Sequence, residues 1–345
     1  MLHRVVWVLL IATALVACRD MPLRGRRAPP PAEAPQPAPA PAPQPVGDGA
    51  PVQVPGQQYA VRSVDMLVLP DPARNKELQL RVTYPQAGGP LPVIVFSHGA
   101  WASKDDYRVL ANHWAANGYV VIQPNHSDAG TLGGKPGPGA FRDWQNRPKD
   151  VHKILDSLSF VEGSIGDLAG KLDRSVIGVG GHSFGANTAQ LVAGAHVTMP
   201  GGRKLSGFSD SRPRAYLLIS PQGVGGQYRE DAWRDMTSPV MTITGTNDKG
   251  REGSGWQWRT DPHRLSPPGD KYLLVLDKAY HDMGGVVGNN PLYEYPANDR
   301  QVALVKAASL AFWDAHVKNR ASSEQVLASR RLIDESGAVA ELESR

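Results

Sequence analysis

Six nearly unbroken apolar runs, separated by stretches with helical periodicity, constrain the fold of this chain more than any other feature. Continuous apolar strings of this length are typical of strands that are covered on both faces, as in a parallel sheet. In chain order the runs are VIVF (93–96), YVVI (119–122), VIGV (176–179), YLLI (216–219), VMTI (240–243) and YLLVL (272–276). An earlier run, LQLRVTY (78–84), alternates apolar and polar residues and predicts a strand with one solvent-facing side.

Helical periodicity lies between these runs. Ser103 and Asp106 have the spacing of a capping box and precede one apolar stripe, and Pro148 suits the first position of a second helix. The stripes are Tyr107, Leu110, Ala111, Trp114 and Ala115, then Val151, Ile154, Leu155 and Leu158, and later Leu304, Ala307, Ala308, Ala311, Phe312 and Ala315. This alternation predicts an α/β fold with a mostly parallel central sheet and helices on both faces.

Residues 1–17 have the layout of a secretory signal peptide. His3 and Arg4 precede thirteen mostly apolar residues, which are too few to span a bilayer. The sequence LVAC (15–18) resembles the lipobox of bacterial lipoproteins, in which cleavage precedes a cysteine that then carries acyl chains. We therefore expect Cys18, the only cysteine, to be a lipidated N-terminus rather than an incidental cysteine. That resemblance implies an exported protein with a lipid anchor in the bacterial cell envelope, and Arg19 after the cysteine favours the outer membrane.

The rest of the chain divides into three parts by composition. Residues 18–55 form a proline- and alanine-rich stretch that cannot bury a core and predicts an extended tether. Residues 56–318 carry all the apolar runs and the helical stripes, so they form the folded domain. Residues 319–345 become polar, and we expect a peripheral helix with a frayed tail.

The charge balance gives no sign of a nucleic-acid partner. The formal net charge is +4, but five of the 37 basic and three of the 33 acidic residues lie before residue 56, so the remainder carries only +2. A nucleic-acid interface needs basic residues gathered on one face or groove. The sequence has no His-Glu-x-x-His, paired-cysteine or calcium-loop spacing, so we expect no metal and no cofactor.

The segment GVGGHSFGANTAQ (178–190) contains a Gly-x-Ser-x-Gly frame centred on Ser183. In a chain with 36 glycines such a frame can be an inert serine in a glycine-rich turn. Its context is more specific, because it follows a strand candidate and precedes a helix candidate, as a nucleophile elbow requires. In an elbow the serine lies on a strained turn, and Gly181 and Gly185 would let strand and helix approach closely. Ser183 is therefore the candidate nucleophile.

A serine nucleophile needs a histidine base and a carboxylate that orients the histidine. In this strand-turn-helix setting both are expected on loops after later strands, with the acid before the histidine. Asp248 in TGTNDKG follows one strand candidate, and His281 in DKAYHDMGG follows the next. We predict His281 as the base and Asp248 as the orienting acid. Asp282, next to His281, and Asp270, before the last strand, are the alternatives for the acid.

An oxyanion that develops during acyl transfer needs preorganised N–H donors. The usual pair is the amide after the nucleophile and an amide in the loop after an early strand. Phe184 supplies the first, and Ala100 in VIVFSHGAWAS supplies the second. His98 in the same loop is interpreted as a turn-stabilising residue rather than a second base.

Taken together, these motifs resemble those of serine esterases of the α/β-hydrolase superfamily, and they are similar to dienelactone-hydrolase-like and platelet-activating-factor-acetylhydrolase-like enzymes. The segments that carry the likeness are FSHGAW (96–101), GHSFGAN (181–187), TGTNDKG (244–250) and AYHDMGG (279–285). The likeness covers about residues 60 to 318 and implies the α/β-hydrolase fold. It also implies carboxylic-ester hydrolysis by Ser183, His281 and Asp248. Dienelactone hydrolase itself uses a cysteine nucleophile, so Ser183 separates this chain from that activity.

Only nineteen residues, 220–238, separate two apolar runs at the point where many relatives insert a cap, so we expect no large cap domain. An uncapped serine suits amphiphilic, bulky or polymeric acyl esters. Trp256 and Trp258 could line an acyl pocket or simply pack their loop. Besides hydrolysis, acyl transfer to an alcohol and noncatalytic binding in the envelope remain possible functions, and the oligomeric state stays open.

Overall fold

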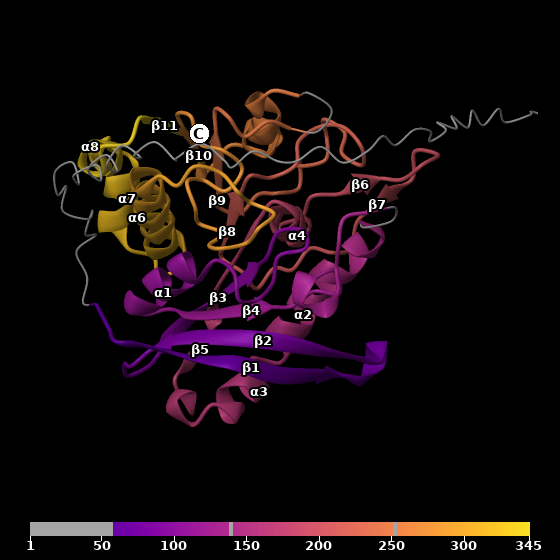
Figure 1. Ribbon diagram of the computed structural model, residues 1–345, viewed down its shortest axis with the longest axis vertical. Helices are drawn as coiled ribbons and strands as arrows, with labels where there is room; N and C mark the ends of the chain where they lie inside the picture. Colours follow the sequence, from indigo (N-terminus) through magenta and orange to yellow (C-terminus); the bar gives the residue numbers. More distant parts are fainter. Residues whose placement is uncertain (1–57, 138–140, 251–253) are drawn as a thin grey trace, which may run out of the picture. The chain divides into compact units, whose positions relative to one another are not determined.

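The computed structural model describes residues 58–137, 141–250 and 254–345. A nine-stranded sheet with the order β1-β2-β4-β3-β5-β8-β9-β10-β11 forms the centre of this part (Figure 1). The six strands from β4 to β10 in that order pair in parallel, whereas β1–β2, β2–β4 and β10–β11 pair antiparallel. The predicted α/β class with a mostly parallel sheet is confirmed.

Each of the six apolar runs lies in one of the parallel strands, except that Tyr119 immediately precedes β4. The strands of the sheet are β1 (Val61–Asp71), β2 (Lys76–Pro85), β3 (Leu91–Ser97), β4 (Val120–Pro124), β5 (Leu172–His182), β8 (Ala215–Ile219), β9 (Val240–Gly245), β10 (Lys271–Leu276) and β11 (Ala340–Ser344). A separate two-stranded sheet pairs β6 (Val197–Thr198) with β7 (Lys204–Leu205). These runs can be apolar throughout because helices cover both faces of the sheet.

The central sheet separates the hydrophobic core into two layers, one on each of its faces. Alternate strand side chains point to opposite faces, so Val93 and Val95 enter one hydrophobic cluster while Ile94 and Phe96 enter the other. The first cluster includes residues of α2 (Asn146–Asp156), α3 (Leu158–Ser164) and α4 (Phe184–Val192). The second includes residues of α1 (Arg108–Ala116), α6 (Asp299–His316), α7 (Ala321–Leu327) and α8 (Arg331–Ser336). The short helix α5 (Asp261–Leu265) lies between β9 and β10 along the chain and contacts both strands.

The order of the strands places a switch point beside β3. From β3 the chain moves outward to β4 on one side, and it later returns to pair β5 on the other side. In open α/β sheets the crevice outside the carboxyl ends of the strands at such a point is the usual ligand site. The loops after β3 and β5 therefore face the region where a functional site is expected.

Two local predictions need correction. Ser103 does bond to the Asp106 carboxylate, with its backbone nitrogen at 2.6 Å and its hydroxyl at 2.9 Å, but α1 begins only at Arg108, so this pair closes a turn before the helix. The second half of the run 78–84 is buried on both sides rather than half exposed. Arg81 can be buried there because its guanidinium pairs with the carboxylates of Asp65 and Asp105.

The C-terminal segment is more ordered than the expected frayed tail. Residues 319–345 form α7, α8 and β11, and β11 pairs antiparallel with β10 from Tyr272–Ser344 to Leu276–Ala340. The polar composition hid this strand because an edge strand has only one neighbour and keeps exposed side chains. The C-terminus thus extends the sheet.

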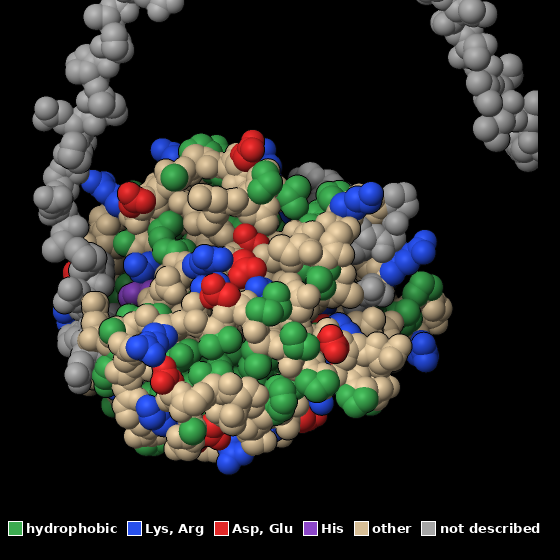
Figure 2. Space-filling view, turned by 60° about the horizontal axis from the view of Figure 1, so that its bottom comes forward, with side chains coloured by type: hydrophobic (Ala, Val, Ile, Leu, Met, Phe, Trp, Pro, Cys, Tyr) green, Lys and Arg blue, Asp and Glu red, His purple; other side chains and the backbone are tan. Residues whose placement is uncertain are grey.

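Charges of both signs are distributed over the surface. Figure 2 shows Lys and Arg side chains interspersed with Asp and Glu on the face that it displays, in keeping with the nearly balanced charge of this part of the sequence. Cys18, the predicted signal peptide and the predicted tether lie outside the described residues. Within the described residues, no helix is both long and apolar enough to cross a membrane.

Candidate active site

Ser183 lies at the sharp turn between β5 and α4. Its backbone has φ 54° and ψ −116°, a strained conformation for a residue with a side chain, which costs about 1–3 kcal/mol. A Cβ on Gly181 would meet the backbone of Gly185, and a Cβ on Gly185 would meet the backbone of Ser97 at the end of β3. The two glycines therefore let helix α4 pack directly against the strand ends. The sequence frame owes its spacing to this close approach.

His281 and Asp248 meet Ser183 from two later loops. His281 follows β10, and its Nε2 lies 2.9 Å from the Ser183 hydroxyl oxygen. Asp248 follows β9, and its Oδ1 lies 2.8 Å from Nδ1 of the same imidazole. Three residues from distant parts of the chain thus form one continuous hydrogen-bonded relay. Such a relay can move a proton away from the serine hydroxyl.

Asp248 is buried and held by donors on every side. Oδ1 accepts from His281 and, at 3.1 Å, from Nε of Arg259, while Oδ2 accepts from the Thr244 hydroxyl at 3.0 Å. Burial alone would raise the pKa of this carboxyl, but the His281 imidazole and the Arg259 guanidinium outweigh burial and hold the pKa well below its usual range. Asp248 is therefore a carboxylate at neutral pH.

The other two acid candidates do not contact His281. Asp282 accepts a hydrogen bond from the amide of Gly284 at 3.3 Å within its own turn. Asp270 immediately precedes β10, whereas His281 follows the carboxyl end of that strand. Of the three predicted alternatives, the structure brings only Asp248 to the imidazole.

Arg259 and Ser220 belong to this site, although the sequence analysis did not identify them. Arg259 lies in the 3-10 turn Trp256–Thr260, and its Nη1 donates to the carbonyls of Ser220 and Pro221 at 3.1 and 3.0 Å. The Ser220 hydroxyl lies 2.7 Å from Nδ1 of His281. Neither residue belongs to a sequence motif, because both reach the site through loops whose course only the folded chain determines.

A buried chain of polar groups links the backbone of His281 to the loop after β3. Nε2 of His182 donates to the carbonyl of His281 at 2.7 Å, so Nδ1 is free to accept from the Tyr107 hydroxyl at 2.8 Å. The same hydroxyl accepts from the amide of Gly99 at 3.1 Å. Burial, aided by the neighbouring His281, lowers the pKa of His182 to about 3, so this imidazole stays neutral.

The two residues predicted to supply the oxyanion donors, Ala100 and Phe184, line the same hollow as Ser183. The amide of Phe184 is the first in α4, so the helix itself offers no acceptor for it. Ala100 is buried in the turn after β3, and both residues line the same hollow as Ser183 and His281. An oxyanion attached to Ser183 would therefore form in the hollow that these two residues line.

This hollow, the Ser183 cavity, has a volume of about 590 Å³. Aromatic side chains from several segments line it, namely Trp101, Phe141, Trp144, Phe184, Tyr228, Trp258 and Tyr293. Trp258 is held by a hydrogen bond from its indole nitrogen to the carbonyl of Val224 at 2.6 Å, whereas Trp256 does not line the cavity. Trp258 therefore borders the site, and Trp256 does not.

A family model described as the alpha/beta hydrolase family matches residues 94–337, more than two thirds of the chain. This chain belongs to the alpha/beta hydrolase family. The predicted superfamily is confirmed, and membership supports an enzyme of the hydrolase class. A search of curated proteins finds no match.

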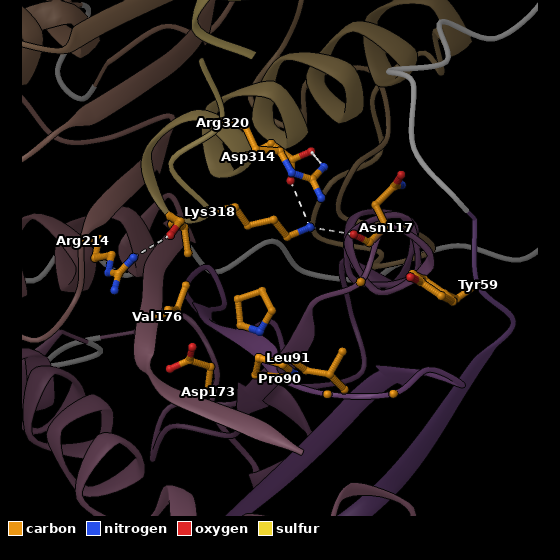
Figure 3. Close-up of a pocket in the computed structure, with 15 residues that line it drawn as sticks. Tyr59, Pro90, Leu91, Asn117, Asp173, Val176, Arg214, Asp314, Lys318 and Arg320 are labelled. Carbon is orange, nitrogen blue, oxygen red and sulfur yellow. Dashed lines mark hydrogen bonds and ion pairs between the residues drawn. The ribbon is translucent and has the colours of Figure 1, made fainter. Parts of the chain in front are cut away.

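This alpha/beta hydrolase has a second cavity at the opposite edge of the sheet, against the starts of β3 and β5, with a volume of about 650 Å³ (Figure 3). Its charged side chains pair with groups of the protein. Lys318 donates to Asn117 and Asp314, Arg320 pairs with Asp314, and Arg214 donates to a backbone carbonyl. The described residues that line it include no serine, cysteine or histidine. It is therefore not the candidate catalytic site.

Among residues 58–137, 141–250 and 254–345, no three His, Cys, Asp or Glu side chains are arranged to hold a metal ion. The histidines near Ser183 have other partners instead. Nδ1 of His98 donates to the carbonyl of Gly99 at 2.6 Å, which agrees with its interpreted role in the turn.

Proposed function

We propose that this alpha/beta hydrolase is a serine esterase that cleaves carboxylic esters through an acyl-enzyme intermediate. Ser183 is the nucleophile, His281 the general base and then acid, and Asp248 the carboxylate that orients and stabilises the imidazole. The amides of Ala100 and Phe184 form the oxyanion hole. The observation that carries this proposal is the relay of 2.9 and 2.8 Å from the serine hydroxyl to the buried carboxylate.

The first half of the reaction forms the acyl-enzyme. The Ser183 oxygen attacks the ester carbonyl carbon while Nε2 of His281 takes the hydroxyl proton. The carbonyl oxygen becomes an oxyanion, which the two amides stabilise. When the tetrahedral intermediate collapses, the bond to the alcohol oxygen breaks and the imidazolium gives its proton to that oxygen. Asp248 compensates the positive charge that His281 carries between these two transfers.

The second half releases the acid. Water enters the place left by the alcohol and attacks the acyl carbon, while His281 removes its proton. The second tetrahedral intermediate expels the Ser183 oxygen, which takes the proton back from the imidazolium. An alcohol in place of water would give acyl transfer instead, so the two activities differ only in the acceptor that reaches the acyl-enzyme.

The lining of the Ser183 cavity favours uncharged acyl groups with substantial apolar area. Aromatic rings border it on several sides, and the cationic Arg259 in its lining is already paired with Asp248. The segment 220–238 lines part of this cavity but contains no helix or paired strand longer than an isolated bridge, so it is a loop and not a cap domain. We therefore propose amphiphilic, bulky or polymeric acyl esters as substrates.

Hydrolysis of p-nitrophenyl acetate and butyrate by the purified protein tests the proposal. We expect turnover in the wild type. In Ser183→Ala we expect the rate to fall by at least about 10⁴-fold. Ser309→Ala is the matched control, because Ser309 is a buried serine on α6 that bonds to Trp114. Turnover that survives Ser183→Ala would refute the nucleophile.

Two further measurements separate the alternatives. If added ethanol diverts the acyl group from acid to ethyl ester with no change in the rate of p-nitrophenol release, an acyltransferase is favoured. If wild type and Ser183→Ala are equally inactive on both esters and an alkyl fluorophosphonate does not label Ser183, a noncatalytic binding role is favoured.

The cellular location is a proposal from the N-terminal sequence alone. A lipid anchor at Cys18 would hold the hydrolase at the cell envelope, and the Pro/Ala-rich tether would separate the domain from the membrane. Globomycin, which blocks lipoprotein processing, should cause the precursor to accumulate. Cys18→Ser should abolish labelling by a fatty-acid probe, and a labelled Cys18→Ser protein would contradict the anchor.

A further inference from the structure

Arg147 lies between the two segments that carry the proposed oxyanion donors. It is the second residue of α2, and its side chain is 1% exposed. Nη1 donates to the carbonyl of His98 at 2.6 Å, and Nη2 donates to the carbonyl of Gly99 at 3.2 Å. The centre of its guanidinium lies 4.3 Å from the centroid of the Phe184 ring. One side chain thus contacts both walls of the oxyanion hole.

Asp128 holds this guanidinium in one orientation. Nε and Nη2 of Arg147 donate to its two carboxylate oxygens at 2.9 and 2.7 Å. Burial would raise the pKa of Asp128, but Arg147 outweighs burial and lowers that pKa to about 2. Because the guanidinium is planar and its donors have fixed directions, this bidentate pair also fixes the donors that point at the loop after β3.

The contact at Gly99 sets the direction of the Ala100 amide. The carbonyl of Gly99 and the N–H of Ala100 belong to one planar peptide group, so a held carbonyl also holds the N–H. Nδ1 of His98 and the amide of Ala102 also donate to this carbonyl, at 2.6 and 3.3 Å, and Nε2 of His98 accepts from the amide of His126 at 3.1 Å. These three hydrogen bonds to the Gly99 carbonyl, of which Arg147 provides one, also polarise the peptide and make its N–H a stronger donor.

On the other side, Arg147 packs on the ring of Phe184. A guanidinium over an aromatic face is attracted by the ring and is worth more when both groups are buried. Phe184 is 7% exposed and provides the first amide of α4. The guanidinium that holds the Gly99–Ala100 peptide therefore also restrains the residue that carries the second amide, Phe184.

We propose that Arg147 is a positioning residue that sets the distance and direction between the two oxyanion-hole amides. This inference rests on the proposed function. Arg147 does not touch the reacting atoms. It acts through the Gly99 carbonyl and the Phe184 ring, and its substitution changes the stabilisation of the tetrahedral intermediate more than the binding of the substrate.

The decisive variant is Arg147→Lys, because an ammonium keeps the charge but cannot donate to Asp128, His98 and Gly99 in one plane. We expect kcat for p-nitrophenyl butyrate to fall about 10- to 100-fold with KM within about twofold of the wild type, since loss of a whole oxyanion donor costs about 10²–10³. n-Butylboronic acid forms a tetrahedral adduct with the serine, and its inhibition constant should rise by a similar factor. Arg81→Lys is the matched control and should change neither quantity.

Asp128→Asn is the second variant and answers the case in which Arg147→Lys fails to fold. It keeps Arg147 but removes the charge that orients it, so a smaller fall in kcat is expected, about 3- to 10-fold, again with weaker boronate binding. Circular dichroism and thermal unfolding identify folded variants.

The outcomes are distinct. A folded Arg147→Lys with kcat and boronate affinity within twofold of the wild type would overturn the inference, and so would a fall in kcat with unchanged boronate affinity. If only Asp128→Asn folds, unchanged kcat and boronate affinity in that variant would overturn it. If Ser183→Ala retains wild-type turnover, the proposed function is refuted, and this inference fails with it. That result comes from the Ser183→Ala assay, before any Arg147 variant is measured.

Discussion

Replacing Asp248 with asparagine tests how the carboxylate acts on His281. The neighbours of Asp248 decide which way the new amide faces. Nε of Arg259 can only donate, and it points at the same oxygen that faces His281. The Thr244 hydroxyl on the other oxygen can rotate and accept instead. The asparagine oxygen should therefore stay toward His281, with the amide nitrogen toward Thr244.

The expected magnitude follows from this orientation. Because Nδ1 of His281 still finds an acceptor, the productive tautomer persists and the variant loses only the negative charge. A hydrogen bond to a charged group is worth about 1.5–3 kcal/mol, so kcat should fall about 10- to 150-fold. In a site where the amide nitrogen faces the imidazole the tautomer changes, and the loss is about 10⁴-fold.

The assay compares kcat for p-nitrophenyl butyrate in the wild type, Asp248→Asn and Asp282→Asn. The Asp282 carboxylate accepts from the amide of Gly284 within its own turn, so Asp282→Asn should stay within twofold of the wild type. Nitrogen-15 chemical shifts of the His281 ring report its tautomer directly. The folded-state pKa of Asp248 is held below its usual range, so its charge stabilises the fold above about pH 4, and Asp248→Asn should unfold at a lower temperature at pH 7.

Three results would refute this reasoning. A loss near 10⁴-fold with the inverted tautomer would show that Arg259 does not set the amide orientation. A loss smaller than threefold would show that Asp248 does not assist His281. A larger effect of Asp282→Asn than of Asp248→Asn would exchange their roles.

Two further predictions concern packing and pH. In Gly185→Ala the new Cβ meets the Ser97 backbone, so we expect at least about 2 kcal/mol of destabilisation in urea unfolding. In the control Gly163→Ala the new Cβ meets nothing within 4 Å, so this variant should be as stable as the wild type or more stable. Equal effects of the two substitutions would contradict the close approach at the elbow. Burial would raise the pKa of Asp150, but His126 and a lysine outweigh burial and hold it at about 2, so the wild type should lose about 2 kcal/mol of unfolding free energy as the pH falls from about 5 to 2. Asp150→Asn should show a shallower acid slope, and parallel slopes would contradict the assignment.

Much of the fold could be predicted because its signals are local. The six apolar runs became the six parallel strands, since a strand covered on both faces has no polar positions to interrupt it. The frame around Ser183 could be recognised because the elbow demands glycine at positions 181 and 185, where a side chain has no space. Order along the chain also placed Asp248 and His281 on successive loops at one edge of the sheet.

The remaining parts depend on contacts between distant segments. Strand β11 is polar and exposed, and only its pairing with β10 makes it a strand. The choice between Asp248 and Asp282 depends on which side chain turns toward His281, and adjacency in the sequence does not determine that. The spacing of Ser103 and Asp106 predicts a helix cap, but the pair closes a turn before α1, because the same hydrogen bonds between the two residues occur in a cap and in a turn.

The sequence by itself determined the alternation of strands and helices and the glycine-flanked serine. It also placed Ser183, Asp248 and His281, in this order, after three of the predicted strands, because each of these signals depends on residues a few positions apart. Tertiary structure alone decided that Arg259 holds Asp248 and that Arg147 spans the walls of the proposed oxyanion hole. A buried guanidinium has no period or motif, since its partners are backbone carbonyls and carboxylates that come together only when the layers of the sheet and helices have packed.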